Sequence, residues 1–414
     1  MSPAKAIPIK MLFWLGAKQI SDISAFLTTI IISVYALSVY GNPMILGILL
    51  TLRMSGSVVG AYLVPTLSSR MTLSSILVFA ELGSAATMIA LAISPTTAHY
   101  IVLLLITPCI GLFHGIFHVA LYSQVHSFVD HKNQHRMNGV LASMNGTAVV
   151  IGGIASSIMY GLLPLKTIFL LDAMTFAITA LVFVMFQRAR GSVKKEPKPV
   201  QSEIKHRFIL SKRVLSTIRI SAGFLLAARF MEAFGSSTHN VGFPIISELY
   251  DQKNPAFWVG WVMAIWGLGK VVAPLATTPM IRRMESSGLR ADMIFVMLLV
   301  LTFAFFLGVF QSVSIWAALF FAFFAGLFDA STETVYYSTL QRNTRVQTDV
   351  LIGASYSLER VGMGAGILFV SYIYSVADAP RDVATWVYIG AIAFCVLLAF
   401  VRMLWPVLRK GRSG

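Results

Sequence analysis

Charged residues are scarce in this chain, and acidic residues are the scarcest. Asp and Glu number 17 and Lys and Arg 32 among 414 residues, so 12% of side chains are charged and 57% are hydrophobic. A soluble domain carries about 25% charged residues. The deficit predicts an all-α, polytopic membrane protein. A net charge of +15 would suggest nucleic acid in a soluble protein, but here we expect no such partner.

Cysteine and nucleotide-binding motifs are also nearly absent. The two cysteines, Cys109 and Cys395, fall inside apolar runs, so we expect no structural disulfide between them, and neither belongs to a metal or redox motif. Lys270 follows Gly267-Leu268-Gly269, yet no complete phosphate-binding loop surrounds it. We therefore expect no cofactor, no metal centre and no enzymatic activity.

What the chain does contain is a series of apolar runs close to the ~20 residues that cross a bilayer. Twelve spans are expected, at residues 12–38, 44–66, 73–93, 100–124, 137–160, 167–186, 215–240, 257–279, 291–310, 314–338, 349–374 and 384–404. Residues 187–213 form a basic linker between residues 1–186 and 214–414, each of which is expected to be a six-helix bundle. Because the basic residues gather in this linker and in alternate loops, both termini and the linker are predicted to be cytoplasmic.

The two halves resemble each other. A shift of about 212 residues places Gly47 on Gly260 and Gly56 on Gly269, and it continues by placing Gly115 on Gly326. One shift that persists over several spans indicates an internal repeat, and two related six-helix halves are typical of transporters. Small residues at helical spacing, the pairs Gly56/Gly60, Gly152/Gly153, Gly269/Ala273 and Gly362/Gly366, are predicted to form the sliding surface between the halves.

Charges within the spans are the candidate functional residues, because each is expensive at bilayer depth. Lys18 and Asp22 are one helical turn apart, and Asp22 lies ~15 Å along the helix from its inner end. Arg53 is about equally deep, so an ion pair with Asp22 is sterically feasible. Two interpretations stay open for Asp22: a coupling or substrate role, or a fixed salt bridge.

Two histidines share one face of the span at 100–124. His114 and His118 could relay protons, hold a metal as a pair at i, i+4, or be polar groups satisfied by their neighbours. A zinc-protease motif is excluded because Gly115 stands where the catalytic glutamate would be.

The second half carries its own charges. Arg229 and Glu232 lie in the seventh span, and Asp329, aligned with His118, lies in the tenth together with Glu333. Asp22, Glu232 and Asp329 are the predicted proton-coupling residues. The predicted substrate-binding set is Lys18, Asp22, Arg53, His114, His118, Arg229, Glu232 and Asp329.

Two six-span halves, a basic linker and arginine-ended turns at Arg70 and Arg283 resemble the major facilitator superfamily. The opening LGAKQISDISAFLTTIIISVYALSVYGNPMILGILL is similar to the subgroup of macrolide-efflux and enterobactin-type siderophore exporters. The resemblance implies that spans 1, 4, 7 and 10 line a central cavity and that spans 2, 5, 8 and 11 join the halves.

The chain also departs from the family pattern. PTLSSRMTLSS keeps only Arg70 of the usual loop motif, the fourth span lacks the arginine of many proton antiporters, and the fifth lacks the antiporter Gly-Pro pair. These departures weaken the argument for proton-driven export without indicating import.

The sequence therefore predicts a monomeric, multi-pass transporter of the cell (inner) membrane that works by alternating access. Mixed charges favour a small polar, anionic or zwitterionic substrate, and the resemblance implies proton-coupled export of a siderophore- or metallophore-like molecule. Multidrug efflux and uptake of a polar metabolite or metal complex are the alternatives, and a divalent-metal carrier or an inactive transporter-like scaffold is less favoured.

Overall fold

The computed structural model describes residues 9–94, 99–128, 134–189, 220–251, 253–343, 348–377 and 379–410, and these residues form helices without any strand. The helices are α1 (Ile9–Tyr40), α2 (Pro43–Ser68), α3 (Leu73–Ile93), α4 (His99–Phe128), α5 (Gln134–Leu162), α6 (Leu165–Ala189), α8 (Ile220–Tyr250), α9 (Pro255–Ala276), α10 (Thr278–Ser286), α11 (Ala291–Gln311), α12 (Ile315–Asn343), α13 (Thr348–Val376) and α14 (Pro380–Lys410).

Twelve of these helices correspond in order to the twelve predicted spans, so the all-α fold is confirmed. Ten of them, within the described ranges, are long and apolar enough to cross a membrane. The other two long helices, α8 and α13, carry the charges of Arg229, Glu232, Glu359 and Arg360. The short helix α10 was not predicted, because its nine residues are amphipathic rather than apolar.

Local sequence sets the tight connection between α1 and α2. After Tyr40, Gly41 adopts a φ of 61°, a left-handed conformation that glycine tolerates without steric strain. The Asn42 side chain then accepts a hydrogen bond of 2.8 Å from the backbone N–H of Met44, and Pro43 occupies the first turn. Each residue of the Tyr-Gly-Asn-Pro turn thus ends one helix or starts the next.

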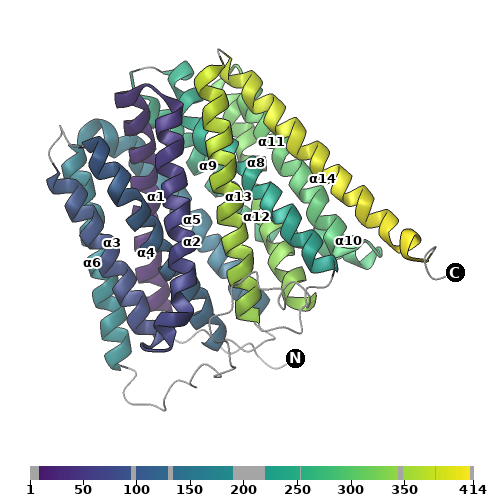
Figure 1. Cartoon of the computed structure of the whole chain (residues 1–414), viewed down its shortest axis with the longest axis horizontal. Helices are drawn as coiled ribbons and strands as arrows, with labels where there is room; N and C mark the ends of the chain where they lie inside the picture. Colours follow the sequence, from purple (N-terminus) through teal and green to yellow (C-terminus); the bar gives the residue numbers. More distant parts are fainter. Residues whose placement is uncertain are drawn as a thin grey trace.

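The helices pack in two groups, α1–α6 and α8–α14, and the groups meet where α5 packs on α9 and α2 packs on α13 (Figure 1). These are the helices that the resemblance implied. The exact boundaries of the linker and of the two bundles stay a prediction, because residues 190–219 lie outside the described part of the chain.

Buried apolar clusters join the two groups at one end only, within the described residues. Leu46 of α2 packs with Val241 of α8 and Val370 of α13, and Val34 of α1 packs with Val259 of α9. All lie toward the end at which α1 stops and α2 begins. The two largest clusters each stay within one group: one runs along the second group from Leu225 to Phe310, and the other lies around Trp14 and Phe183 toward the opposite end of the first group.

Most of the glycines that were predicted to form the sliding surface between the halves instead pack against helices of their own half. A Cβ on Gly56 would meet the Pro108 carbonyl of α4 at 2.0 Å, and one on Gly269 would meet the Phe323 carbonyl of α12 at 2.0 Å. Gly60, Gly152, Gly362 and Gly366 likewise face helices of their own half. The prediction was wrong for these residues. It holds for Gly153, whose Cβ would lie 2.6 Å from the Gly260 carbonyl across the boundary.

The same contacts correct the repeat alignment. A Cβ added to Gly111 would lie 1.9 Å from the Arg53 carbonyl oxygen, and a Cβ added to Gly326 would lie 1.9 Å from the Trp266 carbonyl oxygen. Gly326 is therefore equivalent to Gly111, one helical turn from the predicted Gly115. By this register Asp329 corresponds to His114 and not to His118.

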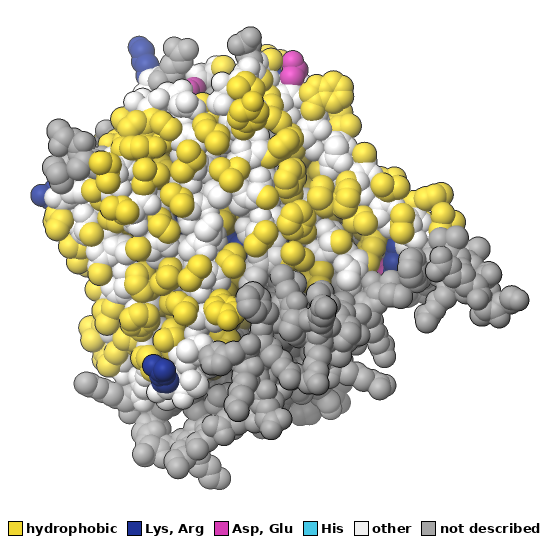
Figure 2. All heavy atoms as spheres, in the orientation of Figure 1, with side chains coloured by type: hydrophobic (Ala, Val, Ile, Leu, Met, Phe, Trp, Pro, Cys, Tyr) yellow, Lys and Arg dark blue, Asp and Glu magenta, His cyan; other side chains and the backbone are white. Residues whose placement is uncertain are grey.

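The surface agrees with a membrane environment. Figure 2 shows one face that is covered over its middle mainly by hydrophobic side chains, with charged side chains visible chiefly near the helix ends. Large exposed apolar residues such as Leu105, Leu181, Trp316 and Phe400 would be unfavourable in water and suit lipid.

Candidate functional site

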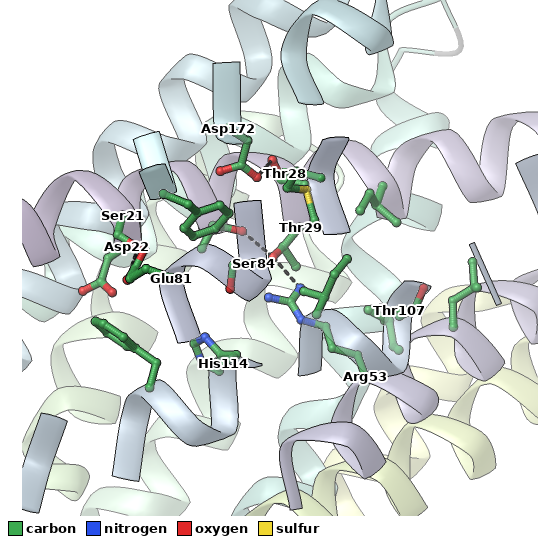
Figure 3. A pocket seen from close by; sticks show the side chains of 18 of the residues that line it. Ser21, Asp22, Thr28, Thr29, Arg53, Glu81, Ser84, Thr107, His114 and Asp172 are labelled. Atoms are coloured by element: carbon green, nitrogen blue, oxygen red, sulfur yellow. Dashed lines mark hydrogen bonds between the residues drawn. The ribbon is translucent and has the colours of Figure 1, made fainter. Parts of the chain in front are cut away.

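A cavity of about 40 Å³ lies inside the first helical group and is drawn in Figure 3. This volume has room for a few water molecules and not for a bulky solute. Its polar lining comes from five helices and consists of Ser21, Asp22, Thr28, Thr29, Arg53, Glu81, Ser84, Thr107, His114 and Asp172.

Asp22 pairs with Lys18, one turn away on α1, through a salt bridge between Lys18 Nζ and Asp22 Oδ2. Arg53 is turned elsewhere: its Nη1 donates a 2.5 Å hydrogen bond to Thr29 Oγ1. The feasible Asp22–Arg53 pair is thus not formed. Among the described residues no carboxylate lies within ion-pairing distance of Arg53.

Two carboxylic side chains outside the predicted set also line the cavity. Glu81 of α3 and Asp172 of α6 are each only 2% exposed. Ser21 Oγ donates to both carboxylate oxygens of Glu81, at 3.0 and 3.2 Å, and Thr28 donates to Asp172 Oδ2. A carboxylate within an otherwise apolar span was a signal that could have found both, since such residues are functional candidates by default.

The histidines of α4 divide between two environments. His114 lines the cavity, whereas the His118 ring lies between those of Tyr122 and Tyr356, with centroids 4.5 and 4.4 Å away. Tyr356 belongs to α13, so this stack crosses the boundary between the helical groups. The ring centroids of His114 and His118 are 6.4 Å apart. Within the described residues, no group of three or more potential metal ligands occurs.

The charges of the second group form two ion-pair networks. Arg229 donates to Glu232 at 2.5 Å on the same helix and to Glu359 of α13 at 2.9 Å. Lys270 of α9 pairs with Asp329 of α12 at 2.8 Å and reaches Glu333 at 3.8 Å. Desolvated charges this deep require such partners.

Arg360 connects the two groups. Its Nη1 lies 3.6 Å from the Met54 sulfur of α2, and its guanidinium lies 4.8 Å from the centre of the Tyr356 ring. Arg360 of α13 thus reaches α2 of the other half. Arg360 Nε and His118 Nδ1 are buried and have no hydrogen-bond partner in the described part of the structure.

The structure therefore brings together part of the predicted set. Lys18, Asp22, Arg53 and His114 surround one cavity or adjoin it, and His118 stands at the boundary. Arg229, Glu232 and Asp329 lie in the other group with their own ion-pair partners.

Comparisons with known proteins agree with this architecture. The family model described as Major Facilitator Superfamily matches residues 19–234, just over half of the chain. No curated protein sequence matches this chain. A solved structure, the crystal structure of nucleoside transporter NupG, superposes with a TM-score of 0.65 over 96% of this chain and 98% of that chain, at 11% sequence identity.

At that identity the match to NupG shows a shared fold alone. The family match covers the chain from α1 into α8, and the fold match covers nearly all of it. The protein is thus a multi-pass membrane protein and a non-enzymatic carrier of the secondary-transporter type. The chain belongs to the Major Facilitator Superfamily.

Proposed function

We propose that this carrier exports a small polar solute with an anionic or zwitterionic group by alternating access, in exchange for protons. It works as a monomer in the cell (inner) membrane, with both termini and the linker in the cytoplasm. A siderophore- or metallophore-like substrate is the class that the resemblance of residues 15–50 implies.

The observation that carries this proposal is the junction of α2, α4 and α13. There the guanidinium of Arg360 and the ring of His118 each present a buried nitrogen without a hydrogen-bond partner among the described residues, on either side of Tyr356. A buried unsatisfied polar group is unfavourable by about 1–3 kcal/mol. A ligand with acceptor oxygens, such as a carboxylate or catecholate, would satisfy these groups.

Arg53 supports the same assignment. Arg360 contacts Met54, the residue beside Arg53, so two guanidinium groups approach the junction from opposite halves. Their mutual repulsion is relieved when an anion binds between them. Because one arginine belongs to each half, such an anion would draw the halves together.

The arrangement of the apolar clusters suggests the transport state. The halves are joined where α1 ends and α2 begins, and with cytoplasmic termini this end faces away from the cytoplasm. The structure then corresponds to a conformation closed to the outside. The His118–Tyr356 stack also closes the junction itself, so a cytoplasmic solute would reach it only after that stack separates.

Proton coupling is assigned to Asp22, Glu232 and Asp329. Each is ion-paired, with Lys18, Arg229 and Lys270 respectively. Each pair lies within one half, so a movement of side chains or helices inside that half must separate it. Separation would favour protonation of the carboxylate, and return of the lysine or arginine would release the proton.

The test uses purified protein in liposomes that contain a pH-sensitive dye. Gradients of metallophores, organic acids and cationic drugs are imposed in turn, and proton movement is recorded. We expect protons to move opposite to an anionic or zwitterionic solute. Arg360→Gln should weaken its apparent affinity by about ten- to a hundredfold, since a charge-assisted hydrogen bond contributes about 1.5–3 kcal/mol.

Arg290→Gln is the matched control, because Arg290 pairs with Asp292 at a helix end and is half-exposed. Preference for cationic drugs would replace the proposal with multidrug efflux. Movement of solute and protons in the same direction would indicate uptake instead.

A further inference from the structure

Among the described residues, Glu81 and Asp172 differ from the other carboxyl groups inside the helical groups because no lysine or arginine lies within ion-pairing distance of them. Asp22, Glu232, Glu359 and Asp329 each have a lysine or arginine within ion-pairing distance. Within the described residues, Glu81 and Asp172 have only hydroxyl partners at hydrogen-bonding distance. Both are almost completely buried.

Asp172 also has an oxygen that nothing satisfies. Its Oδ1 is buried and without a hydrogen-bond partner among the residues described, while Oδ2 accepts from Thr28. The side chain lines the cavity that also holds Glu81 (Figure 3). An unpaired ionised carboxylate in such a site is strongly unfavourable, whereas a protonated carboxyl group is neutral.

We propose that Glu81 and Asp172 form a proton-binding site inside the N-terminal helical group, and that both are protonated in this conformation. The inference rests on the proposed function in that these protons are ones the carrier exchanges for its solute. It places proton storage in α3 and α6, away from the junction of the two halves.

The surrounding charged groups explain how such a site could release its protons. The ionisable groups from the helices around the cavity are Lys18 and Asp22 on α1, Arg53 on α2, Glu81 on α3, His114 on α4 and Asp172 on α6. Arg53 is the one of these cations with no carboxylate partner, and it is held by Thr29. Thr29 adjoins Thr28, the residue that contacts Asp172.

A shift of α1 relative to α2 would break the Arg53–Thr29 hydrogen bond and free the guanidinium for Asp172. An arginine beside a carboxyl group favours the ionised form, so Asp172 would release its proton. The released proton would pass through water in the cavity to Asp22, a carboxylate that lines the same cavity and is paired with Lys18. The cavity has room for the few waters that such a transfer requires.

The test is infrared spectroscopy of the purified full-length protein in lipid nanodiscs at neutral and alkaline pH, without any solute. A protonated carboxyl group has a carbonyl absorbance that ionised carboxylates lack and that shifts in heavy water. We expect the wild type to show this absorbance at neutral pH, Glu81→Gln and Asp172→Asn each to lose part of it, and the double variant to lose it.

Asp292→Asn is the control, because Asp292 is held by Arg290 and Arg402 and should contribute nothing to the absorbance. Absorbance that persists in the double variant would overturn the proposal. If a variant does not fold, the wild type alone decides, since a complete lack of carboxylic-acid absorbance at neutral pH would also overturn it.

The liposome flux assay reports separately on the proposed function. A wild type with protonated Glu81 and Asp172 but without proton-coupled solute movement would refute the exporter and keep the proton-binding site. Proton-coupled export together with ionised Glu81 and Asp172 would support the exporter and refute the proton-binding site.

Discussion

The His118 ring of α4 stacks on the Tyr356 ring of α13, with 4.4 Å between centroids and 22° between planes. This contact joins residues from the two halves beside the guanidinium of Arg360, whose Nε is buried. A stack of this kind can form only while the halves are close at this level. It therefore stabilises the conformation described here relative to one in which the junction is open.

Replacing Tyr356 with Leu should shift the balance between transport states. An aromatic pair contributes about 0.5–1.5 kcal/mol beyond its buried area, and 1 kcal/mol corresponds to about a fivefold change in population. Spin labels at Ser69→Cys and Ser286→Cys, both exposed at helix ends in opposite halves, would report the change as a new distance population. Cys109 and Cys395 are replaced beforehand.

Phe305→Leu is a suitable control for that measurement, because Phe305 stacks on Phe324 and Phe328 within one half. It should leave the distance distribution unchanged. An unchanged distribution for Tyr356→Leu as well would mean that the stack does not set the balance.

The contact between Gly153 and Gly260 gives a second prediction. Because a Cβ on Gly153 would lie 2.6 Å from the Gly260 carbonyl and 3.0 Å from the Ala264 nitrogen, Gly153→Ala must push α5 from α9. Overpacking of this kind typically costs about 1–3 kcal/mol. We expect a lower unfolding temperature in detergent and reduced solute flux.

Gly390→Ala is the matched control, since a Cβ there would meet nothing within 4 Å. Alanine is the better helix former by about 1 kcal/mol, so this variant should be as stable as the wild type or more so. Equal stability of the two variants would show that α5 and α9 separate without penalty.

Twelve spans could be predicted because long apolar runs and alternate basic loops are sequence properties. The rotation of each helix about its axis is not a property of the local sequence. For this reason Arg53 was predicted to lie near Asp22, whereas the Arg53 side chain faces Thr29. The repeat alignment failed at Gly326 for a related reason. A shift of four residues keeps the same helix face, so apolar similarity alone cannot distinguish Gly111 from Gly115.

The sequence was enough to predict which types of residue form the site, but not which of them lie together. Charges inside the spans indicated a polar interior, but whether a given carboxylate has a cation depends on a neighbouring helix. Asp329 has Lys270 from α9, whereas Glu81 has Ser21 from α1 as its hydrogen-bond partner in the part of the chain that the structure describes. Neither partner is near in sequence, and no pattern in the chain connects them.

The Lys270–Asp329 pair provides a third prediction, on stability. Both side chains are buried, at 8% and 13% exposure, and Lys270→Met would leave Asp329 without its cation. Removing one partner of a buried pair costs about 3–5 kcal/mol. The double variant Lys270→Met with Asp329→Asn should recover most of the loss, measured as unfolding in mixed micelles. A double variant no more stable than the single one would mean that Lys270 acts chiefly through Glu333, 3.8 Å away, or through the Trp266 ring, whose centre lies 4.7 Å from Lys270 Nζ.

The last prediction concerns Asp22, which is paired with Lys18 and lies beside Glu81 in the cavity lining. Asp22→Asn removes a charge that must separate from Lys18 before the group can accept a proton. If Asp22 couples transport, the variant should still exchange solute across liposomes at equal pH, but a pH gradient should no longer drive accumulation. Asp251→Asn, at the end of α8 and remote from the cavity, is the control. Normal gradient-driven transport by Asp22→Asn would reduce the Lys18–Asp22 pair to a structural salt bridge, and coupling would then rest on the carboxyl groups of the other half or on Glu81 and Asp172.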